Sequence, residues 1–161
     1  MVAQTPIRDT GEMPIGGTIQ FEEIPPDDCL MLLDSAYVGR VGVSVQALPV
    51  ILPVNYVMHE GDVVFRTSAG TKLAAATAGA VVAFEVDHYD PHGTRGWSVL
   101  LQGRAEEVVD PAQVAQARTL PLHSWALDGA ADHFVRLRPT MISGRRFRPA
   151  ELAELPDETI N

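Results

Sequence analysis

The sequence predicts a mostly β protein in which six antiparallel strands form a barrel with small helices added. Six segments are apolar or alternate between apolar and polar residues, and this alternation has the period of a β-strand. The connections between these segments are hairpin-like and not regularly helical, which favours antiparallel pairing. The chain has 161 residues, a length that suits one domain with a real core.

The predicted strands differ in how they should be buried. The segment 50–58 places its even-numbered apolar residues on one face, but Pro53 cannot donate a ladder hydrogen bond and so predicts an edge or a bulge. The segment 80–88 is strongly apolar and β-branched, as in a central strand. The six predicted strands are 37–45, 50–58, 63–67, 80–88, 95–108 and 134–142.

Three short helices are expected between or before these strands. Proline and aspartate open the segments 25–34 and 111–119, and both residue types suit the first turn of a helix. A third helix is expected over 70–78. The expected organisation is a flexible N-terminal arm over 1–20, a barrel domain over 21–148 and a C-terminal tail over 149–161.

Composition and charge argue against several classes of partner. The formal net charge is −9 and the pI is about 4.9. Nucleic acids and anionic membranes require a basic surface, so neither is expected as a partner. Cys29 is the only cysteine, so neither an intrachain disulfide nor a cysteine-based metal cluster can form. No histidine pair has helical ligand spacing, and no metal is expected. These features, with no visible leader segment, fit a cytoplasmic protein.

The segment from Phe65 to Lys72 has the layout of an anion site. A strand is followed by a turn that carries glycine and hydroxyl groups, and then by the start of a helix. The first backbone N–H groups of a helix lack an internal partner and attract negative charge. Thr67, Ser68 and Thr71 add hydroxyl donors, and Lys72 adds a positive charge. The segment predicts binding of a phosphate-bearing small molecule, with an ordinary helix cap as the alternative.

No catalytic constellation is visible in the rest of the sequence. There is no Gly-x-Ser-x-Gly elbow, no Walker motif and no dinucleotide fingerprint. Arg145, Arg146 and Arg148 form a basic cluster that is either a solvated turn or a ligand or subunit contact. Trp97 and Trp125 are large apolar surfaces of the kind that anchor cores and interfaces. No catalytic residue is therefore identified.

Five motifs, taken in chain order, resemble a known family. They cover roughly residues 22–148, and their combination is more specific than any one of them. The order is similar to that of the pyridoxamine-phosphate-oxidase-like superfamily of FMN-binding split β-barrels, above all its flavin-binding branch with nitroimidazole-resistance-type proteins. The motifs are Tyr37–Gly42, Pro53–Tyr56, Phe65–Lys72, Gly96–Val99 with Gln102–Ala105, and Ile142–Arg146.

The resemblance implies a homodimer with one FMN at each of two equivalent interface sites. It places the FMN phosphate on Thr67, Ser68 and Lys72, in agreement with the anion site. The strand Pro53–Tyr56 would lie along the isoalloxazine ring, and later segments would close the site, some of them from the partner subunit. The cofactor-binding residues implied in this way are Pro53, Val54, Asn55, Tyr56, Arg66, Thr67, Ser68, Thr71, Lys72, Trp97, Ser98 and Arg145.

The function implied by the resemblance is an FMN-dependent oxidoreductase with a small organic substrate. Pyridoxine phosphate is not the expected substrate. True pyridoxamine phosphate oxidases carry basic residues on the strand that leads to the phosphate site, and an arginine and tryptophan segment near the C-terminus holds the substrate phosphate. Here residues 50–58 hold no Lys or Arg, and the Arg145–Arg148 cluster has no tryptophan neighbour. A reductase that uses a deazaflavin coenzyme, and a non-enzymatic flavin- or haem-binding protein, are the alternatives. Hydride chemistry takes place on the flavin ring itself, so the absence of catalytic side chains agrees with the hypothesis.

Overall fold

A computed structural model describes residues 19–68, 79–122 and 133–150. Within these ranges the chain forms seven strands and two helices, and the sheet is antiparallel throughout. Neither described helix is long or apolar enough to cross a membrane. The elements are β1 (Ile19–Ile24), α1 (Pro26–Asp34), β2 (Val38–Val45), β3 (Leu48–His59), β4 (Asp62–Thr67), β5 (Val81–Tyr89), β6 (Gly96–Glu107), α3 (Pro111–Ala117) and β7 (His133–Pro149).

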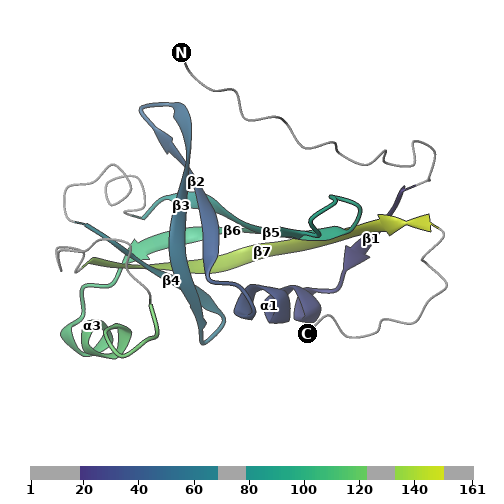
Figure 1. The fold of residues 1–161 in the computed structure, drawn as a ribbon. Helices are drawn as coiled ribbons and strands as arrows, with labels where there is room; N and C mark the ends of the chain where they lie inside the picture. The colour runs from purple at the N-terminus through teal and green to yellow at the C-terminus, as the bar shows by residue number, and fades with distance from the viewer. Residues whose placement is uncertain (1–18, 69–78, 123–132, 151–161) are drawn as a thin grey trace, which may run out of the picture.

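The strands close into a ring, as the sequence predicts. The order along the sheet is β1-β7-β4-β3-β2-β5-β6, and a further pairing of β6 with β7 joins the two sides. Six strands therefore make the ring, and they are the six predicted ones. The seventh strand, β1, lies outside the ring on the far half of β7 (Figure 1). The prediction missed β1 because its sequence, IQFEEI, is short and carries two acids.

The last strand is much longer than predicted. β7 runs to Pro149, whereas the sequence suggested an end near residue 142 with a basic turn beyond it. Its first part pairs with β4, its last part pairs with β1, and β6 lies along most of its length. Arg148 in this extension forms an ion pair with Glu22 of β1 at 2.6 Å. The basic cluster therefore lies in a strand and not in a turn, and Glu22 of β1 offsets the charge of Arg148.

The two described helices confirm their sequence signals. Asp110 accepts hydrogen bonds from the backbone N–H groups of Ala112 and Gln113 at 3.1 and 3.0 Å, which caps α3. Pro26 occupies the first turn of α1. The helix expected over 70–78 lies outside the described residues, as do most of the expected arm and tail, although Ile19 and Gln20 already belong to β1.

Pro53 lies on a strand edge, as predicted. The Tyr56 N–H donates to the Tyr37 carbonyl across β2 and β3 at 3.1 Å. Because strand residues alternate in direction, the nitrogens of Pro49 and Pro53 point away from β2. The ladder between β3 and β4 begins only at Tyr56, so neither proline removes a ladder hydrogen bond.

The core lies inside the ring and under the two helices. The interior holds large side chains from every ring strand, among them Tyr56, Phe65, Phe84 and Leu101. Tyr56 and Phe84 meet edge to face, with ring centroids 4.8 Å apart. A second, smaller cluster packs α3 against the outside of β4 and β7. One part of the outer barrel surface is thus covered by α3.

We expect Gly39→Ala to destabilise the fold. A Cβ at Gly39 would lie 2.2 Å from Cζ of Phe84, and this fully buried ring has no room to retreat. Overpacking of this kind costs about 1–3 kcal/mol. Gly42→Ala on the same strand is the control, because its Cβ would meet the nearest atom, Cβ of Ala83, at an ordinary 3.5 Å. Urea unfolding should show a lower free energy of unfolding for Gly39→Ala alone; equal values would contradict the packing described here.

Candidate functional site

The expected ring-binding strand presents only half of its side chains to the outside. Pro53 and Asn55 of β3 face outward, whereas Val54 and Tyr56 are buried in the barrel interior. The backbone groups of Pro53 and Asn55 that point away from β2 do not pair with β4, because the β3–β4 ladder begins only at Tyr56. A ligand on this strand would therefore meet backbone and two outward side chains.

The Tyr56 side chain packs in the core and does not reach the outer surface. Its hydroxyl donates a hydrogen bond to the Leu33 carbonyl of α1 and so ties the helix to the barrel. Burial, with the nearby charge of Asp34, raises the pKa of Tyr56 far above its ordinary value. The implied role of Tyr56 as a cofactor contact can therefore rest on its backbone only.

The end of β4 carries the expected phosphate residues. Thr67 is buried, and Ser68 directly after it is half-buried. Thr71 and Lys72 lie outside the described residues. Arg66 points to the side of α3, where its guanidinium stands 5.4 Å from the centre of the Phe134 ring. We call Thr67 and Ser68 the phosphate half-site, to which Thr71 and Lys72 belong only as a prediction from the sequence.

A pocket beside the phosphate half-site was not foreseen. It has a volume of about 240 Å³ and is lined by Arg66, Arg118 and the apolar side chains of Leu120, Leu122 and Phe134. Sequence reasoning missed it because α3 and the end of β4 are far apart along the chain. Arg66 therefore lines this pocket on the α3 side of β4.

The remaining expected site residues meet on β6 and β7. Ser98 and Arg145 are register partners and both face outward. They line a groove of about 540 Å³ together with Glu23, Leu100 and Ser143. Arg145 is exposed and forms no ion pair with a described residue. Ser98 and Arg145 are called the closing half-site below.

Trp97 behaves differently from Ser98. Its side chain lies on the other face of β6, packs against the core and stands beside His88, with ring centroids 6.3 Å apart. Trp125 lies outside the described residues. The structure therefore brings Ser98 and Arg145 together on the outer face, whereas the Trp97 ring lies on the opposite face of β6.

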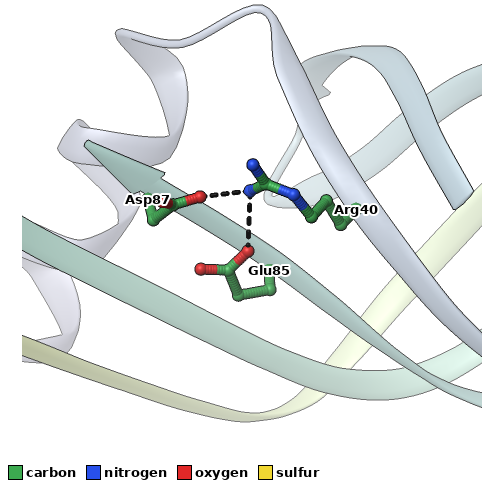
Figure 2. Close-up of polar contacts among 3 residues, drawn as sticks. All are labelled: Arg40, Glu85 and Asp87. Atoms are coloured by element: carbon green, nitrogen blue, oxygen red, sulfur yellow. Dashed lines mark hydrogen bonds and ion pairs between the residues drawn. The ribbon is translucent and has the colours of Figure 1, made fainter. Parts of the chain in front are cut away.

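A charged cluster next to the closing half-site was also missed by sequence reasoning. Figure 2 shows Arg40 of β2 reaching two carboxylates of β5 through one guanidinium nitrogen. Nη1 lies 3.1 Å from Oε2 of Glu85 and also contacts Oδ1 of Asp87. Burial raises the pKa of Glu85, as does the charge of Asp87, while Arg40 opposes the rise. The available signal was two acids, two residues apart, in an otherwise apolar strand.

The two half-sites lie at opposite ends of β7. Thr67 pairs with His133 at the start of this strand, and Ser98 pairs with Arg145 near its end. At about 3.3 Å per residue, roughly 40 Å of strand separates them. Figure 1 shows β7 running along the length of the molecule. Thr67 and the pair Ser98–Arg145 therefore lie far apart along this strand within one copy of the chain.

Comparisons with known proteins agree with this fold. Residues 25–146 match the family model described as pyridoxamine 5'-phosphate oxidase. The chain belongs to this family. An uncharacterized Mycobacterium tuberculosis protein, Rv0080, is 41% identical over 129 residues, which are 77% of this chain and 84% of that protein.

Solved structures give the same result. The structure of the FAD binding protein from Mycobacterium smegmatis is 38% identical and has a TM-score of 0.69; the match covers 79% of this chain and 100% of that one. A FAD-binding protein from Mesorhizobium loti is 23% identical with a TM-score of 0.66, covers 81% of this chain and 98% of its own, and shares the fold.

We expect Tyr56→Phe to lower the free energy of unfolding by about 1–2 kcal/mol, because the Leu33 carbonyl loses its donor. The folded state keeps the Tyr56 pKa above its ordinary value of about 10. Above that pH only the unfolded chain releases the proton, so the stability present below pH ~10 is lost as the pH rises. Urea unfolding at neutral and alkaline pH measures both effects.

The control for this variant is Tyr37→Phe at an exposed tyrosine, which should stay within about 0.5 kcal/mol of the wild type. Equal stability of Tyr56→Phe and Tyr37→Phe would contradict the core role of Tyr56.

Proposed function

We propose that the protein binds a flavin nucleotide between two copies of the chain and uses it as an oxidoreductase on a small organic substrate. The observation that carries this proposal is the division of the expected binding residues into two half-sites at opposite ends of β7. Two copies around a twofold axis can complete a site that one copy cannot. The name of the 38% identical relative, a FAD binding protein, supports a flavin.

The donor set fits a flavin. Hydroxyl groups at Thr67 and Ser68, with Thr71 and Lys72 after them, suit a phosphate. The free backbone edge at Pro53 and Asn55 suits the polar pyrimidine edge of the ring. These residues bind and orient the nucleotide, and Ser98 and Arg145 of a second copy exclude water from it. A bound flavin would supply the hydride or electron transfer, which needs no catalytic side chain.

FMN is the cofactor that the resemblance implies, and the relative's name favours FAD. Both contain the phosphate and ring that the two half-sites address, so we propose recognition of the FMN portion. The nucleotide released on denaturation, identified by chromatography, decides between them. Tight binding of a deazaflavin coenzyme instead would favour the alternative reductase.

Arg145→Ala should weaken flavin binding. Removal of a charged hydrogen-bond donor costs about 1.5–3 kcal/mol of binding free energy. Arg138→Ala is the matched control, because Arg138 is an exposed arginine of the same strand and pairs with Asp62 away from the closing half-site. Fluorescence titration with FMN and FAD measures both affinities. A wild-type protein that binds neither nucleotide would overturn the proposed function.

Mixing two defective variants tests whether the site is shared. Lys72→Ala damages the phosphate half-site and Arg145→Ala damages the closing half-site. In a mixed dimer one site carries both changes and the other carries none, so wild-type affinity should return at up to half of the sites formed by mixed dimers. A site within one chain would show no recovery. Reduction of the bound flavin by NADH or NADPH then distinguishes an oxidoreductase from a flavin carrier.

A further inference from the structure

We infer that the pocket between α3 and β4 is an adenylate site, which holds a purine ring together with its ribose phosphate. The source of the adenylate rests on the proposed function, because the AMP half of FAD is what a flavin site would bring here. The pocket has a volume of about 240 Å³ and lies on the outside of the barrel. Its lining residues are Arg66, Ala117, Arg118, Leu120, Leu122 and Phe134, and it is called the α3 pocket below.

The size and the walls of the α3 pocket suit a ring system. Pockets for whole ligands measure roughly 300–1,000 Å³, so this one is too small for a complete flavin nucleotide and large enough for a part of one. Leu120, Leu122 and Phe134 give it apolar walls. A hydrated inorganic anion would gain nothing from these walls, whereas a flat ring buries them. The occupant is therefore expected to carry a ring.

Arg66 and Phe134 together supply a stacking surface. They are register partners on β4 and β7, and the Arg66 guanidinium stands over the Phe134 ring, 5.4 Å from its centre. A guanidinium that is held on an aromatic ring is planar and can itself stack on a second ring. Purine and pyrimidine bases stack on arginine planes and on aromatic side chains in this way. The pair therefore favours a flat heteroaromatic ring such as adenine.

Arg118 adds a second positive charge to the same pocket. It follows the last residue of α3 and is exposed, so its side chain can reach a ligand at the mouth of the pocket. Guanidinium groups bind phosphates through paired hydrogen bonds. Two arginines on one small pocket also make a local positive site in a chain of net charge −9. The ring that the walls favour is therefore expected to carry a phosphate.

The α3 pocket begins one residue away from the phosphate half-site. Consecutive strand residues face opposite sides, so Arg66 lines the pocket while Thr67 is buried beside the interior. In FAD the second phosphate is joined to the FMN phosphate through one bridging oxygen, and the two phosphates are neighbours. An FMN phosphate on Thr67 and Ser68 therefore places the adenylate of FAD next to the α3 pocket.

The first test compares the affinities for FAD and FMN by fluorescence titration. The wild type should bind FAD at least about tenfold more tightly than FMN, because only FAD fills the α3 pocket. Arg118→Ala and Arg118→Glu should weaken FAD binding at least about tenfold and leave FMN binding unchanged. Arg95→Ala is the matched control and should change neither affinity. Arg95 is also an exposed arginine, next to Gly96, which pairs with Phe147 at the far end of β7.

A second test distinguishes FAD from a free nucleotide as the source of the adenylate. Wild-type protein saturated with FMN is titrated with AMP by calorimetry, which does not depend on the variants folding. Equal affinities for FAD and FMN, with AMP binding that Arg118→Ala removes, support the adenylate site and assign it to a free nucleotide. Equal affinities for FAD and FMN with no AMP binding overturn the adenylate site. A preference for FAD that both Arg118 variants retain also overturns it.

The outcomes separate the adenylate site from the proposed function. A wild type that binds FMN more tightly than FAD, and binds no AMP, overturns the adenylate site and leaves the flavin proposal standing. A wild type that binds neither flavin overturns the flavin proposal. AMP binding by that flavin-free protein, lost in Arg118→Ala and kept in Arg95→Ala, would still support the adenylate site.

Discussion

The pairing of β6 with β7 is the constraint on which the rest of the molecule depends. It runs from Gly96 opposite Phe147 to Glu107 opposite Val135 and turns an open sheet into a ring. Closure satisfies the backbone groups of both strands and encloses the apolar interior. It also fixes β7 as a long axis, and this separates the phosphate half-site from the closing half-site.

The sequence predicts the ring because alternation is a local property. Each of the six ring strands has an apolar face that can be recognised from its own residues, and Pro53 correctly marks an edge. β1 and the extension of β7 lack that signal, since Glu22 and Glu23 lie opposite arginines of β7 only when strands from the two ends of the described fold pair. Their structure depends on contacts more than 100 residues apart, which no local window contains.

The candidate site divides in the same way. The anion-site segment and the family resemblance place the candidate residues on β3, β4, β6 and β7, and the match of residues 25–146 shows the family. The resemblance names whole segments and does not separate the side chains that face the core from those that face outward. Val54 and Tyr56 turn inward because the even-numbered residues of β3 face the core, and Trp97 does so on β6. The Arg40 cluster escaped prediction because it joins two strands 45 residues apart.

β1 has one more consequence, for the connectivity of the chain. Ile19 stands opposite Pro149, so the two ends of the described fold leave the barrel at neighbouring positions. Chains with adjacent ends tolerate circular permutation, in which the old ends are joined and new ones are opened in an exposed turn. The turn at Gln46 and Ala47, between β2 and β3, is such a place. We therefore expect the strands to pair in the same way when the chain is synthesised in a different order.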